Sequence, residues 1–288
     1  MKKRILSSLV LWGSLLGTIL LLKIHGGLLI LTLFSAAAQW ELYQMWQKAG
    51  KRVAPVAGII PGTLLLLATH YLHEPLLQVA QTPYLMGLVA ALVAIVCASA
   101  LALVIPTKTR FPGETLLPTS LGILYIPYLL HFLVLIYHLE AGPGGLFLCT
   151  WFIITAKFTD MGALLVGKYF GKHKMAPKLS PGKTWEGTFG GALASSGASV
   201  ATAAIGNQYL AFDFEFPLLA AALIAIPIAF GGQLGDLLES SFKRKAKMKD
   251  SGNTIPGIGG TLDLLDSLIP TAPLAYFLLI LSLGLKPA

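Results

Sequence analysis

Two stretches in the second half of the chain combine acidic residues, basic residues and glycines. The first runs from Lys168 to Gly187 and the second from Gly235 to Asp266. More than half of the chain's 13 acidic residues lie in or beside them: Asp160, Glu186, Asp236, Glu239, Asp250, Asp263 and Asp266. Mg²⁺ is bound by carboxylate oxygens and usually takes one or two of them together with substrate phosphates. The two stretches therefore predict a site that handles a metal-bound phosphate.

The spacing of the acids supports this interpretation. Asp236 and Glu239 are three residues apart, as are Asp263 and Asp266, so each pair shares one face of a helix. Lysines and arginines among the acids provide the cations that phosphoryl chemistry needs around its oxygens. Glycines allow backbone N–H groups to approach an anion closely, and several occur together at 252, 257, 259 and 260.

Each of these features also has a simpler interpretation. Basic loops orient membrane proteins, Asp263 and Asp266 suit the first turn of a helix, and glycines form turns. Asp160, inside an apolar run, is either functional or paired with Lys157, and the role of Glu41 stays open between an interior and an interfacial position. The clustering of these groups is what favours a common site.

The elements that position these residues are apolar. The chain has 288 residues, of which 55% are hydrophobic and 12% are charged, and its mean hydropathy is +0.74. A soluble domain carries about 25% charged residues. This composition excludes a soluble globular protein, and the long apolar runs predict transmembrane helices, which pair every backbone group internally.

We predict an all-α, polytopic transmembrane bundle of about nine spans, each of about 20 apolar residues. The predicted spans are 7–23, 27–46, 54–72, 83–105, 117–139, 145–167, 187–206, 216–238 and 264–284. All 21 lysines and arginines except Lys23, Lys157 and Lys286 then fall in loops on one side, so the positive-inside rule places the N-terminus in the cytoplasm. The net charge of +8 is explained by this topology without any nucleic-acid partner.

This topology divides the chain into two regions. Residues 1–140 are predicted to form N-terminal transmembrane helices, and residues 141–288 a catalytic transmembrane region. The polar loops 168–187 and 239–263 of the second region are both predicted to face the cytoplasm, where a water-soluble substrate is available. The protein is thus expected in the cell membrane, with its site open to the cytoplasm.

Two blocks within these loops resemble the phosphatidate cytidylyltransferases, also called CDP-diacylglycerol synthases. One block is Ser180–Gly187, which reads SPGKTWEG, and the other begins at Ser240 with SSFKR. The second block continues, at the spacing of the family signature, through Lys249-Asp250, Gly259-Gly260, Asp263 and Asp266. The resemblance extends from Asp160 to Asp266. Ile258 and Leu264 depart from it, because the family commonly has His and Arg at these positions.

The resemblance implies a reaction of CTP with phosphatidate that gives CDP-diacylglycerol and pyrophosphate, for phospholipid biosynthesis. It also implies Mg²⁺ as cofactor, with room for a second cation, and a homodimer in membrane lipid. The expected metal ligands are Asp236 and Asp263, supported by Asp266 and Glu239. The expected catalytic residues are Asp236, Asp263, Lys243, Arg244, Lys249 and Asp250. The expected substrate-binding residues are Ser180, Lys183, Thr184, Ser240, Gly259 and Gly260.

Other classes of function also fit parts of the sequence. A transporter of a phosphorylated solute would use intramembrane charges, although it would favour polar residues through the whole depth of the bilayer and paired halves. Another membrane phosphotransferase, such as a CDP-alcohol phosphatidyltransferase, would carry a D-G-x-x-A-R arrangement that this sequence lacks. A non-enzymatic scaffold would leave the acid cluster unexplained.

Overall fold

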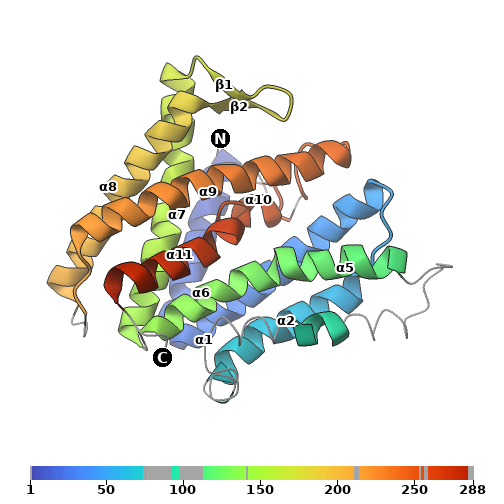
Figure 1. The fold of residues 1–288 in the computed structure, drawn as a ribbon, viewed down its shortest axis with the longest axis horizontal. Coiled ribbons are helices and arrows are strands. Elements are labelled where there is room, and N and C mark those ends of the chain that lie inside the picture. The colour runs from blue at the N-terminus through green and yellow to red at the C-terminus, as the bar shows by residue number, and fades with distance from the viewer. Residues whose placement is uncertain are drawn as a thin grey trace. The chain divides into compact units, whose positions relative to one another are not determined.

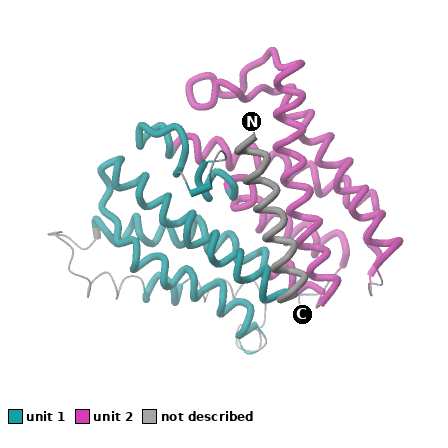
Figure 2. The backbone as a smooth tube through the Cα atoms, turned by 180° about the vertical axis from the view of Figure 1, so that it is seen from behind, with its two compact units in different colours: residues 1–134, 242–265 teal, residues 135–241, 266–288 magenta. Residues whose placement is uncertain are grey.

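The computed structural model is almost entirely helical (Figure 1). It describes residues 2–73, 75, 92–97, 113–140, 142–210, 214–252, 254–255 and 259–284. By contacts it divides into two compact units, which Figure 2 shows in different colours. Unit 1 comprises Met1–Val134 and Phe242–Leu265, and unit 2 comprises Leu135–Ser241 and Asp266–Ala288. The predicted catalytic region therefore contributes residues to both units.

In unit 1, the first helix differs from the prediction. Helix α1 runs without a break from Lys2 to Lys48, where the sequence predicts two spans at 7–23 and 27–46. The glycines at 26 and 27 do not end the helix, because glycine costs only about 1 kcal/mol relative to alanine in a helix interior and no proline follows. The chain turns at Gly50, whose φ of 81° suits glycine, and helix α2 (Pro55–Tyr71) begins on a proline.

The remaining helices of unit 1 pack around Tyr43. Helices α5 (Gly113–Tyr125) and α6 (Pro127–Leu139) replace the predicted span 117–139, with a break at Pro127, and the last residues of α6 belong to unit 2. The buried Tyr43 donates its hydroxyl proton to the Thr119 carbonyl at 2.7 Å. A Cβ on Gly58 of α2 would lie 2.1 Å from the Tyr43 hydroxyl oxygen, and one on Gly122 of α5 would lie 2.2 Å from the Tyr43 ring. Helices α2 and α5 therefore approach α1 this closely only because these residues are glycines.

Unit 2 contains the hairpin that the all-α prediction lacks. Helix α7 (Pro143–Phe170) leads into strands β1 (Lys174–Ala176) and β2 (Ser180–Thr184), which pair antiparallel with Lys174 opposite Thr184. Helix α8 (Trp185–Tyr209) follows directly and lies beside α7, so that the hairpin joins one end of the two helices (Figure 1). Helix α9 (Leu218–Lys245) runs from unit 2 into unit 1.

Small residues allow α7 and α8 to pack closely. A Cβ on Gly162 of α7 would lie 2.5 Å from the Ala194 Cβ, and one on Gly191 of α8 would lie 2.8 Å from the Thr159 carbonyl oxygen. A hydrogen bond also joins the two helices, because the Trp151 indole N–H donates to Ser199 Oγ at 2.9 Å. Small residues and interhelical hydrogen bonds are the usual means of helix association in lipid. The hairpin is thereby anchored on a closely packed pair of helices.

The chain closes with helices α10 (Leu262–Leu265) and α11 (Leu268–Leu283). Among the described residues, four stretches are long and apolar enough to cross a membrane: Glu114–Leu139, Pro143–Phe170, Leu218–Lys245 and Leu262–Leu283. They agree with the predicted spans 117–139, 145–167, 216–238 and 264–284, and the shorter apolar helix Pro55–Tyr71 agrees with 54–72. The predicted span 83–105 lies mostly outside the described residues. The total of about nine spans and the side of the N-terminus remain predictions.

Candidate active site

The hairpin in unit 2 is held by Glu186, in the first turn of α8. Its carboxylate accepts backbone N–H bonds from Lys172 at 3.1 Å and from His173 at 3.2 Å. The His173 ring nitrogen Nδ1 lies 2.5 Å from Glu186 Oε1. The bond to the His173 side chain, followed by the backbone bonds, lowers the pKa of Glu186 to about 2. Glu186 therefore stays ionised at neutral pH and fastens the start of the hairpin to α8.

Thr184, predicted to bind substrate, caps α8. Its hydroxyl oxygen accepts the Gly187 N–H at 3.1 Å, which satisfies one of the free N–H groups at the helix start. The side chain is buried, and a Cβ on Gly171 would lie 2.7 Å from Thr184 Oγ1. The structure thus gives Thr184 a structural role in positioning the hairpin, and direct substrate binding by Thr184 stays a prediction.

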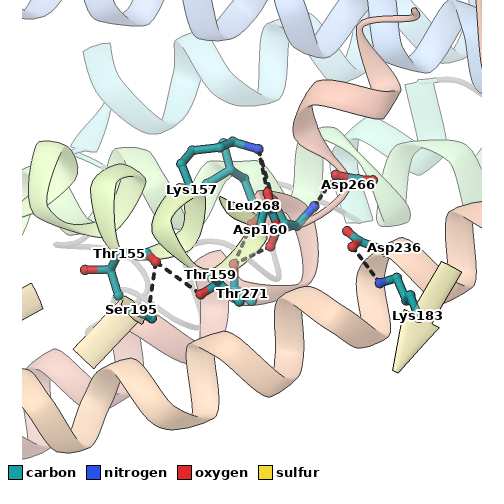
Figure 3. A network of polar contacts seen from close by, with 11 residues as sticks. Thr155, Lys157, Thr159, Asp160, Lys183, Ser195, Asp236, Asp266, Leu268 and Thr271 are labelled. Atoms are coloured by element: carbon teal, nitrogen blue, oxygen red, sulfur yellow. Dashed lines mark hydrogen bonds and ion pairs between the residues drawn. The ribbon is translucent and has the colours of Figure 1, made fainter. Parts of the chain in front are cut away.

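Lys183 points from strand β2 to helix α9. Its Nζ lies 2.6 Å from Asp236 Oδ2 (Figure 3). It also donates to the Gln233 carbonyl at 3.0 Å. The Lys183 and Asp236 side chains are only 15% and 21% exposed. The structure therefore brings together a residue predicted to bind phosphate and a residue predicted to bind metal, although 53 positions separate them in the chain.

A second polar group lies in unit 2, between α7 and the start of α11. Lys157 Nζ lies 3.3 Å from Asp160 Oδ2 and donates to Ser267 Oγ at 3.1 Å, while Ser267 Oγ donates to Asp160 Oδ2 at 3.0 Å (Figure 3). The Ser267 N–H donates to Asp266 Oδ1 at 2.7 Å. The Lys157–Asp160 pairing was one of the two alternatives that the sequence left open. Ser267 was missed, because a serine in an apolar run carries no signal of its own.

The acids of unit 2 form one electrostatic cluster. Coulombic interactions link Asp266 with Asp236, Glu239 and Asp160, and link Asp160 with Asp236. Lys157 forms an ion pair with Asp160, and Lys183 forms one with Asp236. Asp160 Oδ1 is buried and accepts no hydrogen bond from the part of the chain that the structure describes. A cluster of carboxylates beside lysines, with one buried Asp160 oxygen that accepts no hydrogen bond from the described residues, fits a site that receives a cation.

Unit 1 holds the other predicted metal ligand, Asp263. Lys243 Nζ lies 2.8 Å from Asp263 Oδ1, and both side chains are about 15% exposed. The other carboxylate oxygen, Oδ2, accepts the backbone N–H groups of Ser251 at 3.1 Å and Gly260 at 2.8 Å. Gly259 has a φ of 126°, and a Cβ there would lie 2.6 Å from Asp263 Oδ2. Glycine at position 259 therefore lets the backbone close around Asp263.

The other predicted site residues are less enclosed. Arg244, Lys249 and Asp250 are exposed, and Ser180 and Ser240 are partly buried. Leu264, one of the two departures from the family pattern, lies in α10, where its N–H donates to the Thr261 carbonyl at 3.1 Å. Ile258, the other departure, lies outside the described residues.

The predicted metal ligands lie in different units: Asp236, Glu239 and Asp266 in unit 2, and Asp263 in unit 1. Within the described residues, no group of three or more His, Cys, Asp or Glu side chains is arranged to hold a metal by itself. Mg²⁺ does not require such a group, because it keeps several waters and takes substrate phosphates as ligands. The donor set of carboxylates beside lysines therefore fits Mg²⁺ bound together with a phosphate.

Comparison with known proteins agrees with this chemistry. A model of the "Cytidylyltransferase family" matches residues 2–282. A phosphatidate cytidylyltransferase of Pseudomonas aeruginosa is 33% identical over 285 residues, which is 97% of both chains.

Two further relatives share the same name but match over shorter segments. The protein of Haemophilus influenzae is 40% identical over 171 residues, 58% of this chain and 55% of the relative. The protein of Bacillus subtilis is 36% identical over 174 residues, 60% of this chain and 62% of the relative. This chain thus spans just over half the length of some curated relatives and nearly all of another. The match to the family over almost its whole length shows that the chain belongs to the cytidylyltransferase family.

Proposed function

We propose that this membrane protein is a phosphatidate cytidylyltransferase, which converts CTP and phosphatidate to CDP-diacylglycerol and pyrophosphate. The observation that carries the proposal is a repeated pairing of site residues. Lys183 with Asp236, and Lys243 with Asp263, each join a lysine suited to phosphate with a carboxylate suited to a metal ion. Both pairs lie in the segments that resemble this family.

The reaction needs no nucleophile from the protein. An oxygen of the phosphatidate phosphate attacks the α-phosphorus of CTP, a new P–O bond forms, and the bond from the α-phosphorus to the bridging oxygen breaks. Pyrophosphate leaves with the electron pair of that bond. The second pKa of a phosphate monoester is about 6, so the attacking oxygen is already ionised at pH 7. What remains for the protein is to position the two substrates and neutralise their charge.

The ion pairs suit this task. Without substrate, each lysine neutralises a carboxylate in a poorly hydrated setting. When CTP arrives, Lys183 and Lys243 exchange their carboxylates for phosphate oxygens, and Arg244 and Lys249 add positive charge for the leaving pyrophosphate. Asp236 and Asp263, released from the lysines, would hold Mg²⁺, with Asp266 and Glu239 in support. Bound Mg²⁺ would supply charge neutralisation at the phosphates.

The remaining features of the proposal concern the setting. We place the site at the cytoplasmic face of a multi-pass protein in the cell membrane, because CTP is water-soluble and the basic loops fall on one side of the predicted topology. Phosphatidate would enter from the lipid with its chains still in the bilayer. A homodimer is proposed on the resemblance alone.

The test is an assay of the purified protein in detergent with phosphatidate and, in turn, CTP, UTP, ATP and GTP. We expect pyrophosphate release with CTP, dependent on phosphatidate, together with a lipid product that carries CMP. Absence of pyrophosphate release with CTP and phosphatidate would contradict the proposal. Transport of a phosphorylated solute by the protein in vesicles, or turnover of an added CDP-alcohol, would then favour one of the other classes of function.

A further inference from the structure

Glu41 is a buried carboxylate far from the two polar stretches in sequence. It lies on α1, only 4% exposed, between the exposed Trp40 and the fully buried Leu42. An ionised group removed from water is costly unless hydrogen bonds replace its hydration. A buried acid in this position therefore requires donors, and the structure shows where they come from.

All of its observed donors belong to one short segment, residues 251–262 of the same unit. Oε1 accepts from the Thr254 hydroxyl, and from the Thr261 N–H at 3.0 Å. Oε2 accepts from the Ser251 hydroxyl at 3.0 Å and from the Leu262 N–H at 2.9 Å. These four donors are neutral, and each oxygen has one hydroxyl and one backbone donor. Glu41 thus fixes a loop that lies more than 200 residues further along the chain.

Two glycines allow the segment to close around the carboxylate. A Cβ on Gly252 would lie 2.6 Å from Glu41 Oε1. A Cβ on Gly260 would lie 2.4 Å from Glu41 Oε2 and 2.7 Å from the Gly252 nitrogen. Real Cβ atoms do not approach other atoms so closely, so the wrapped conformation depends on glycine at both positions.

The same segment also holds Asp263, through backbone N–H groups that donate to its carboxylate. Ser251 donates its hydroxyl proton to Glu41 and its backbone N–H to Asp263 Oδ2. Gly260 donates its N–H to Asp263, and the next two N–H groups, of Thr261 and Leu262, go to Glu41. The orientation of Asp263, and hence its 2.8 Å contact with Lys243, depends on a backbone that Glu41 holds in place.

We propose that Glu41 is a positioning residue for the nucleotidyl transfer. It acts through the 251–262 segment, which it holds in the conformation that aims Asp263 at Lys243 and at the metal-bound phosphate. This inference rests on the proposed function, since it concerns how well the site is ordered for that reaction. Residues that orient a metal ligand typically change metal affinity or activity by about 10- to 100-fold when mutated.

The primary variant is Glu41→Gln, which keeps the size of the side chain. The two hydroxyl donors can rotate to accept a bond, but the two N–H groups cannot. Because each carboxylate oxygen bonds one backbone N–H, the glutamine NH₂ opposes an N–H in either orientation of the amide. Glu114→Gln, at an exposed acid of the same unit that pairs with Arg52, is the matched control. Ser251→Ala is a milder variant, which removes one hydroxyl donor and keeps the Ser251 N–H to Asp263.

Two measurements test the inference. In the ligand-free protein, hydrogen exchange of the 251–262 amides should become at least 10-fold faster in Glu41→Gln, and should not change in Glu114→Gln. In steady-state assays of the folded fraction, kcat should fall 10- to 100-fold and the Mg²⁺ concentration for half-maximal rate should rise, while KM for phosphatidate changes less than 3-fold. Ser251→Ala should raise the exchange rate and the half-maximal Mg²⁺ concentration, and lower kcat, each by a smaller factor than Glu41→Gln.

Each result decides the matter. Unchanged exchange and an unchanged Mg²⁺ dependence in Glu41→Gln would overturn the proposal. A loss of activity that only follows the loss of folded protein, with a normal Mg²⁺ curve, would also overturn it. If Glu41→Gln does not fold, a wild-type Mg²⁺ curve and exchange pattern in Ser251→Ala would count against the proposal. An inactive wild-type protein would instead contradict the proposed function, and the exchange result would still report on the role of Glu41.

Discussion

Lys183 on strand β2 and Asp236 on helix α9 form an ion pair with an Nζ–Oδ2 distance of 2.6 Å. A salt bridge with both side chains largely removed from water is weak support for stability alone, because desolvation offsets most of the Coulombic attraction. The pair is better explained as a site held ready for a phosphate and a cation. This interpretation distinguishes two roles of the pair, which can be tested separately.

Exchanging the two residues separates stability from catalysis. Breaking a buried pair from one side costs about 3–5 kcal/mol, so Lys183→Gln and Asp236→Asn should each lower the thermal stability. The double variant Lys183→Asp/Asp236→Lys should recover much of that stability, because opposite charges still face each other, yet it should stay inactive. Thermal unfolding in detergent and the pyrophosphate assay are the two measurements. Recovery of activity in the double variant would show that the pair is only structural.

Asp236 and Asp263 are predicted to be essential for turnover. Removing one electrostatic element from an active site typically costs on the order of 100-fold in kcat. We therefore expect Asp236→Asn and Asp263→Asn each to lose at least that factor while still inserting in membranes. Chelation of divalent cations should abolish the wild-type reaction, and added Mg²⁺ should restore it.

The control for these variants is Glu215→Gln, which neutralises an exposed acid in unit 2. It should keep wild-type turnover and the wild-type response to Mg²⁺. Turnover by either aspartate variant within a few-fold of wild type would show that this residue is not part of the active site. Full activity after chelation would show that the reaction does not need a divalent cation.

Much of the helical fold follows from the apolar runs alone. Helices α7, α9 and α11 lie close to the predicted spans, because a run of about 20 apolar residues has few alternatives to a membrane helix. The sequence does not predict that the segments 7–23 and 27–46 form the single helix α1. Two glycines between apolar segments are equally compatible with a break and with a continuous helix. The hairpin was missed because β1 has three residues and β2 five, too few for a period-two pattern.

The site was predictable in its residue types but not in its pairings. Acids, lysines and glycines in two blocks indicate phosphate chemistry, yet nothing in the sequence pairs Lys183 with Asp236 or Lys243 with Asp263. Glu41 carried one signal, an acid within an apolar run. Its partners are more than 200 residues away, and such long-range contacts depend on tertiary packing that a single sequence does not reveal.

The packing of α7 against α8 makes a prediction with a control on the same helix. Gly191→Ala places a Cβ 2.8 Å from the Thr159 carbonyl oxygen, which is backbone and cannot move aside, so unfolding should become easier by about 1–3 kcal/mol. Gly197→Ala, also on α8, meets no atom within 4 Å and should stabilise the helix by about 0.5–1 kcal/mol. Denaturant titration of both variants in detergent measures the difference. Equal stabilities would show that the two helices do not pack as closely as described.

Glu186 makes the stability of the hairpin depend on pH in the acid range. The bond to the His173 side chain and the backbone bonds lower the pKa of Glu186 from its ordinary value of 4.5 to about 2. Since the pKa is lower in the folded state, the ionised carboxylate stabilises the fold fully above pH 4.5, and this contribution is lost as the pH falls toward 2. The difference in melting temperature between wild type and Glu186→Gln should therefore shrink as the pH falls below 4.5. His173→Ala removes the largest cause of the shift and should make this pH dependence weaker. A difference that stays constant down to pH 2.5 would contradict the assigned contacts of Glu186.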